Sequence, residues 1–113
     1  MSSVRQNKVA RLLLKELSII FQQNGLDWFP NTMVSVTVVR VAPDFSFAKV
    51  YLSVFGDIEP KECIKAANLQ AKMIRGILGG RIKSQLRITP EIAFYLDDSL
   101  DYAEALDEAF KAL

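Results

Sequence analysis

The sequence contains no histidine and only one cysteine, Cys63. Without histidine a protein lacks the side chain most often used as a general base and a common zinc ligand. A single cysteine cannot form a disulfide within the chain. The composition therefore argues against a metal site, His-based catalysis and a disulfide scaffold, and we expect no cofactor and no metal ion.

Long apolar runs are also absent. No stretch approaches the roughly 18 residues of a membrane helix, and the first residues lack the basic-then-apolar order of a secretory signal. Half of the 113 residues are hydrophobic, which is enough for one domain, 1–113, to form its own core. We expect a cytoplasmic monomer that has neither a membrane partner nor a small-molecule substrate.

Acidic residues are scarce in most of the chain. Residues 1–95 hold thirteen Lys and Arg against seven Asp and Glu, whereas residues 96–113 hold one Lys against six Asp and Glu. A basic body with an acidic end favours a polyanionic partner for the body. Ordinary solvated surface explains the same counts equally well.

The first 25 residues read as a helix. Ser3 and Gln6 have the spacing of a capping box, and Gly25 is typical of a helix end, which predicts a helix to about Asn24. Its apolar stripe faces a core, and nearly opposite lies a second stripe made of Arg5, Lys8, Arg11 and Lys15. Like charges at this spacing repel one another. A phosphate backbone would relieve that repulsion, so we favour a nucleic-acid surface over a solvated face.

The segment 34–55 predicts an antiparallel β-hairpin. Two runs rich in Val, Tyr and Phe flank the polar break Ala42-Pro43-Asp44. The first run changes the parity of its apolar residues partway along, and a β-bulge near Thr37 or Val38 would restore the register. The aromatic segment 26–31 that precedes the hairpin is expected to be a loop that covers the core.

A second helical region is expected from Pro60 to Gly79-Gly80, bent near Asn68, the weakest helix former in its middle. Residues 76–79, GILG, match the G-x-x-G clamp of nucleic-acid-binding KH domains. We interpret them as the end of the helix, because the two central residues continue its apolar pattern.

A second basic cluster follows and contains Arg75, Arg81, Lys83 and Arg87, with no acid between them in the sequence. The helix dipole accounts for one or two of these cations. Segment 86–96 alternates as a third strand, with Ile88 among its inward residues, and Pro90 favours an edge position. Tyr51 and Tyr95 would share the uncovered sheet face, as a cross-strand contact or as a surface for stacking bases. A last helix is expected over 100–113.

This order of elements favours an α+β fold, in which helices cover one face of a three-stranded sheet. Here the sequence resembles the ribosome-binding factor A family. The resemblance rests on four segments in the family's order: RQNKVARLLLKELSIIF, VTVVRVAPDFSFAKVYLSVFG, AKMIRGILGGRI and LRITPEIAFYLDDSLDY.

The resemblance implies a KH-like fold of the second type, in which an Ala-x-Gly kink between two helices replaces the glycine clamp. It also implies binding to the small (30S) ribosomal subunit during late assembly, maturation of 16S ribosomal RNA and a role in cold adaptation. This chain departs from the family at the kink, where Met73 stands in place of glycine. The bend is then made without glycine or lies nearer Asn68. The acidic end also differs from the family's basic C-terminal extension.

We therefore expect a non-enzymatic ribosome biogenesis factor that binds RNA. Its RNA-binding residues are expected to be Arg5, Lys8, Arg11, Lys15, Lys49, Arg75, Arg81, Lys83 and Arg87. The alternative is a KH-like module that binds RNA or protein away from the ribosome. An enzyme is disfavoured, because its candidate carboxylates, Asp44, Glu91, Asp97 and Asp98, have neither a histidine nor a glycine-rich phosphate loop beside them.

Overall fold

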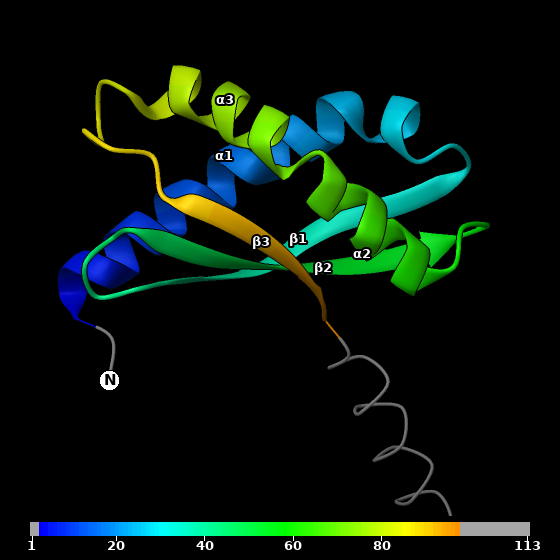
Figure 1. The fold of residues 1–113 in the computed structure, drawn as a ribbon, viewed down its shortest axis with the longest axis horizontal. Helices are drawn as coiled ribbons and strands as arrows, with labels where there is room; N and C mark the ends of the chain where they lie inside the picture. Colours follow the sequence, from blue (N-terminus) through cyan, green and yellow to red (C-terminus); the bar gives the residue numbers. More distant parts are fainter. Residues whose placement is uncertain (1–2, 98–113) are drawn as a thin grey trace, which may run out of the picture.

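The computed structural model describes residues 3–97, which form three helices and a three-stranded sheet (Figure 1). The elements in chain order are α1 (Val4–Trp28), β1 (Thr32–Val41), β2 (Phe47–Gly56), α2 (Pro60–Leu69), α3 (Ala71–Ile82) and β3 (Glu91–Leu96). The expected α+β class is confirmed. The helix expected over 100–113 lies outside the described residues.

The sheet has the strand order β1-β2-β3. Strands β1 and β2 are antiparallel, and their register shifts between Val36 and Val38, which confirms the expected bulge at Thr37. Strand β3 runs parallel to β2, so α2 and α3 form the connection that returns the chain to the same end of the sheet. Strand β3 lies at an edge, as Pro90 predicted.

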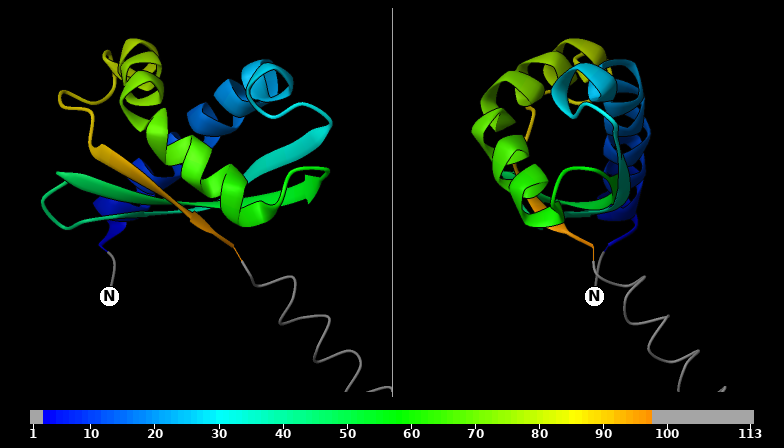
Figure 2. Two further views of the ribbon diagram at one scale, coloured as in Figure 1. Left: turned by 45° about the vertical axis from the view of Figure 1, so that its right-hand side comes forward. Right: turned by 90° about the vertical axis from the view of Figure 1, so that its right-hand side faces the viewer.

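All three helices pack on the same face of the sheet (Figure 2). The core forms where α1 and α3 meet that face, and its fully buried side chains include Leu13, Leu17, Leu52, Ile74 and Phe94. None of the described helices covers the opposite sheet face. One broad face of the sheet is therefore left uncovered by the three described helices.

Helix α1 begins as expected but ends later. The hydroxyl of Ser3 accepts a hydrogen bond from the backbone N–H of Gln6, whose side chain accepts one from the backbone N–H of Ser3. The expected end at Asn24 was wrong, because the helix continues through Trp28. The Trp28 ring packs edge-on against Phe21, with ring centroids 5.6 Å apart. That aromatic contact offsets the roughly 1 kcal/mol that a glycine costs inside a helix.

The second helical region breaks at Gln70, which separates α2 from α3 and has φ −101° and ψ 5°. The bend is thus made without glycine, two residues after Asn68. The side-chain amide of Asn68 donates to the carbonyl of Phe94 and accepts from its N–H. These two bonds fix the end of α2 against β3.

Helix α3 does not end at the glycine pair as expected but continues to Ile82. Ile82 and Leu78 are fully buried, and their packing carries the helix past the glycines. A Cβ at Gly79 would lie 2.9 Å from the Thr89 hydroxyl, so the absence of a side chain lets the following loop approach. Residues 76–79 lie inside the helix, which confirms that they are no clamp loop.

The third strand is shorter than the alternation suggested. It begins at Glu91, and the predicted inward position of Ile88 was wrong, because 68% of Ile88 is exposed. Pro90 offers no N–H to a ladder. The carbonyls of Thr89 and Pro90 accept hydrogen bonds from Arg75 instead of a strand. A side chain of α3 thus holds this segment out of the sheet.

Candidate nucleic-acid interface

The first helix presents its four cations to solvent. Arg5, Lys8, Arg11 and Lys15 are all exposed, on the side of α1 away from the core. Among residues 3–97 the only ion pair joins two other side chains, so none of these four is neutralised by a described acid. The guanidinium carbon of Arg5 lies 5.1 Å from the centre of the Phe45 ring. The stripe is therefore a surface of exposed positive charge.

Arg75 has a different environment in the half-buried space between α3 and the loop before β3. Its Nη2 donates to the Thr89 carbonyl at 2.7 Å, and its Nε lies 3.2 Å from that oxygen and 3.1 Å from the Pro90 carbonyl. Hydrogen bonds from a charged group are stronger than neutral ones. Arg75 therefore secures the loop that leads into β3.

Arg81 contacts an acid that is distant in sequence. Its Nε lies 2.6 Å from Oε2 of Glu16, and the Arg81 side chain is 36% exposed and the Glu16 side chain 12%. The basic cluster is free of acids in the sequence but not in space, because α3 packs beside α1. Lys83 and Arg87 are exposed and form no ion pair with a described residue.

Lys49 lies on the uncovered face of the sheet and faces Arg40 across the hairpin. Its ammonium is 5.7 Å from the centre of the Tyr95 ring. Reasoning from the sequence did not select Arg40. The register of the hairpin could have identified it, since two residues at equal distances from the turn lie opposite each other on antiparallel strands.

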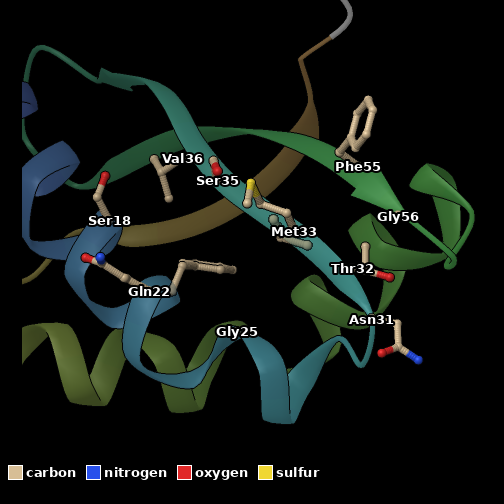
Figure 3. Close-up of a pocket in the computed structure, with 12 residues that line it drawn as sticks. Ser18, Gln22, Gly25, Asn31, Thr32, Met33, Ser35, Val36, Phe55 and Gly56 are labelled. Atoms are coloured by element: carbon tan, nitrogen blue, oxygen red, sulfur yellow. The ribbon is translucent and has the colours of Figure 1, made fainter.

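Two grooves run between α1 and the free edge of β1. The smaller, of about 380 Å³, is lined by residues from the first half of α1, including Arg11, and by the bulge of β1, including Val38. The larger, of about 780 Å³, lies beside the second half of α1. In Figure 3, Ser18 and Gln22 lie on α1 at one side of this groove, and Met33 lies on β1 at the other. No charged residue lines this larger groove.

Of the candidate carboxylates, Asp44, Glu91 and Asp97 lie in the described part of the chain. Asp44 accepts hydrogen bonds from the backbone N–H of Ser46 at 3.1 Å and from its hydroxyl at 2.7 Å. These bonds hold the pKa of Asp44 below its usual value. Glu91 is exposed at the start of β3, and Asp97 accepts from the hydroxyl of Thr37. Asp98 lies outside the described residues.

Other chemistry also lacks a site in the described part of the chain. Burial raises the pKa of the Cys63 thiol, which keeps it protonated and unreactive. Residues 3–97 contain no cluster of three side chains that could hold a metal ion. In the same part of the chain, no helix is both long and apolar enough to cross a membrane. The candidate interface therefore consists of cations and aromatic rings.

The chain is similar to curated proteins along its whole length. The family model for ribosome-binding factor A matches residues 5–110. Ribosome-binding factor A of Cytophaga hutchinsonii is 46% identical over 113 residues, which cover 100% of this chain and 85% of the relative. The Flavobacterium psychrophilum protein of the same name is 38% identical, over 96% of this chain and 85% of the relative.

The fold is also similar to solved structures. The crystal structure of ribosome-binding factor A from Thermus thermophilus superposes with a TM-score of 0.67, at 20% identity, over 80% of this chain and 94% of that one. The solution structure of a Thermotoga maritima protein, described as a putative ribosome binding factor A, has a TM-score of 0.63 at 26% identity, over 84% and 89% of the two chains. The present chain therefore belongs to the ribosome-binding factor A family.

Proposed function

We propose that this protein binds the small ribosomal subunit during late assembly and contacts its 16S ribosomal RNA, without catalysing a reaction. It acts as one ribosome-binding domain, as a monomer in the cytoplasm. Support comes from the family and from a similar structure, a Thermus thermophilus homology model fitted into the map of a 30S complex (TM-score 0.57, 19% identity, 87% of this chain and 97% of that one).

One observation carries the proposal for this chain: the exposed cations of α1 have no acidic partner among residues 3–97. Such a surface binds phosphates through release of counterions, which gives affinity without reading bases. Specificity would then come from the shape of the RNA in the subunit. A purely solvated helix face normally intersperses both charges.

The nine expected RNA-binding residues divide by what they contact. We place Arg5, Lys8, Arg11 and Lys15 at the centre of the interface, with Lys49, Lys83 and Arg87 around it. Arg75 and Arg81 contribute less, because their donors already bind the Thr89 and Pro90 carbonyls and the Glu16 carboxylate. The expected contribution of each cation to RNA binding therefore depends on how many of its hydrogen-bond donors have no protein partner, and not on its charge alone.

The test replaces three cations of α1, Lys8→Gln, Arg11→Gln and Lys15→Gln, and measures co-sedimentation with purified small subunits. Arg5 is left in place because it stacks on Phe45. We expect binding to fall by more than tenfold at physiological salt while the melting temperature changes little, since exposed substitutions shift stability by about 0.5 kcal/mol or less.

A matched control removes the same charge elsewhere. Lys61, Lys65 and Lys72 are exposed on α2 and α3, and α2 makes no contact with α1. Changing these three to Gln should leave binding within about twofold of the wild type. Equal losses in both triple variants would show that only net charge matters, and unchanged binding in the first would remove α1 from the interface.

A further inference from the structure

The uncovered face of the sheet carries two neighbouring rows of side chains. In one row the register aligns Val38 with Tyr51 and Tyr51 with Tyr95, across all three strands. In the next row, it aligns Arg40 with Lys49. The rows are two residues apart along each strand, about 7 Å. An aromatic row and a cationic row therefore lie side by side.

The two tyrosine rings form the centre of this face. Their centroids are 5.7 Å apart and their planes are tilted by 33°. Tyr95 is 41% exposed, and Tyr51 is half-buried. Neither hydroxyl forms a hydrogen bond with another described residue, so the rings are not held there as polar anchors. Adjacent exposed rings on a sheet are a surface on which successive bases stack.

The cationic row is unfavourable without an anion. Like charges directly opposite on neighbouring strands destabilise the pair, and neither Arg40 nor Lys49 forms an ion pair with a described residue. The acids on this face lie at the two ends of β3: Glu91 begins the strand, and Asp97 follows it and accepts from the Thr37 hydroxyl. A phosphate group placed between Arg40 and Lys49 would relieve their repulsion.

The aromatic row is also linked to the cationic stripe on α1. Arg11 of α1 and Val38 of β1 line the same small groove, and Val38 begins the row that contains the tyrosines. A strand of nucleic acid that crosses from the helix to the sheet over the edge of β1 passes from Arg11 over Val38 to the two tyrosines. The larger, uncharged groove lies beside the other half of α1, so it is not on this path.

We propose that the uncovered sheet face binds an unpaired RNA segment, with bases stacked on Tyr51 and Tyr95 and phosphates held by Arg40 and Lys49. The inference rests on the proposed function, which supplies the ligand class, RNA. It adds that the RNA is unpaired and that it binds a second surface, the sheet face. A duplex does not satisfy this face, because its bases are already paired and stacked inside the helix.

The experiment measures fluorescence anisotropy of a labelled, pyrimidine-rich RNA of eight nucleotides and of a fully paired RNA duplex long enough to remain double-stranded. The double variant Tyr51→Leu, Tyr95→Leu should bind the single strand about tenfold or more weakly, since stacking accounts for that much per base. Its binding to the duplex should not change. The salt dependence of both ligands should be retained, because the cations remain.

Two controls separate stacking from other effects. Tyr51→Phe with Tyr95→Phe keeps both rings and should retain single-strand affinity within about twofold. Phe55→Leu removes an aromatic ring that is 80% exposed near the far end of β2, and it should change neither affinity. A loss in the phenylalanine pair equal to that in the leucine pair would overturn stacking.

A second measurement covers the case in which the leucine variant unfolds. In the wild-type protein, the NMR signals of the Tyr51 and Tyr95 ring protons should move upfield when the single strand is added. Unchanged ring signals at saturation overturn the inference. Its failure differs from failure of the proposed function: in the first, the leucine variant binds the single strand as the wild type does, and in the second, the α1 triple variant still binds small subunits.

Discussion

The two basic clusters of this protein resemble each other in sequence but differ in the structure. On α1 the cations point to solvent and have no described acidic partner. At the end of α3, Arg75 binds two backbone carbonyls and Arg81 pairs with Glu16. A count of charges treats the clusters as equal. The difference teaches that a cation is available to RNA only if the fold has not already used its hydrogen-bond donors.

The largest effect is expected from replacing Arg75, the member of the second cluster that holds the loop before β3. Arg75→Met removes the hydrogen bonds to Thr89 and Pro90 and should lower the free energy of unfolding by about 2 kcal/mol, because bonds from charged groups contribute about 1.5–3 kcal/mol. In a domain of this size the melting temperature should fall by about 10 °C, as measured by circular dichroism. Arg87→Met, the exposed control, should stay within about 0.5 kcal/mol of the wild type.

A smaller effect is expected from the exposed members of that cluster. Lys83→Gln with Arg87→Gln should weaken binding to small subunits, but less than the triple change on α1, because two cations and not three are removed. Filter binding at fixed salt compares the two variants. A greater loss of affinity in the Lys83→Gln, Arg87→Gln variant than in the α1 variant would place the centre of the interface at the end of α3.

A still smaller effect is expected when Arg81 is released from its ion pair with Glu16. Glu16→Gln removes the acid that pairs with Arg81, and an ion pair whose arginine is exposed contributes about 0–1 kcal/mol. Stability should therefore change little, whereas affinity for small subunits should rise by about two- to fivefold, since one negative charge leaves a cationic surface. Weaker binding in this variant would mean that the pair positions Arg81 for RNA.

The smallest effect concerns Asp44, the exposed acid in the hairpin turn. Hydrogen bonds from Ser46 lower its pKa in the folded state below 3.8, so the carboxylate stabilises the fold above that pH. This contribution is lost as the pH falls through the lowered pKa. Asp44→Ala should therefore be less stable than the wild type at pH 7, and the difference should shrink as the pH falls through the lowered pKa.

Binding provides the second measurement for Asp44. Its carboxylate is engaged with Ser46 and forms no described ion pair with Arg5, whose guanidinium stacks on the neighbouring Phe45. Affinity for small subunits should therefore remain within about twofold of the wild type. A clear gain in affinity would show that Asp44 neutralises part of the α1 surface.

Local patterns in the sequence predicted most of the fold. The capping box at Ser3, the bulge at Thr37 and the edge position of β3 each follow from a few neighbouring residues. The errors occurred where tertiary packing prevailed. Burial of aromatic rings carries α1 past Gly25, and burial of Leu78 and Ile82 carries α3 past its glycine pair.

The candidate site was less predictable, because its composition depends on contacts between distant segments. Glu16 meets Arg81 only once α3 packs beside α1, and Arg75 meets Thr89 only once the loop folds back. The α1 stripe was predictable, because helical periodicity alone places its cations on one face. The pairing of Arg40 with Lys49 was missed, although both residues lie between the turn and the bulge, where the register of the hairpin is regular.

The salt dependence of binding to small subunits tests the central claim most directly. The slope of log K against log salt should become shallower by about 2–3 when Lys8, Arg11 and Lys15 are changed to Gln, since each phosphate contact contributes about 0.7–0.9. The control triple at Lys61, Lys65 and Lys72 should retain the wild-type slope. Equal slopes in all three proteins would contradict the account, because the cations of α1 would then make no contact with phosphate.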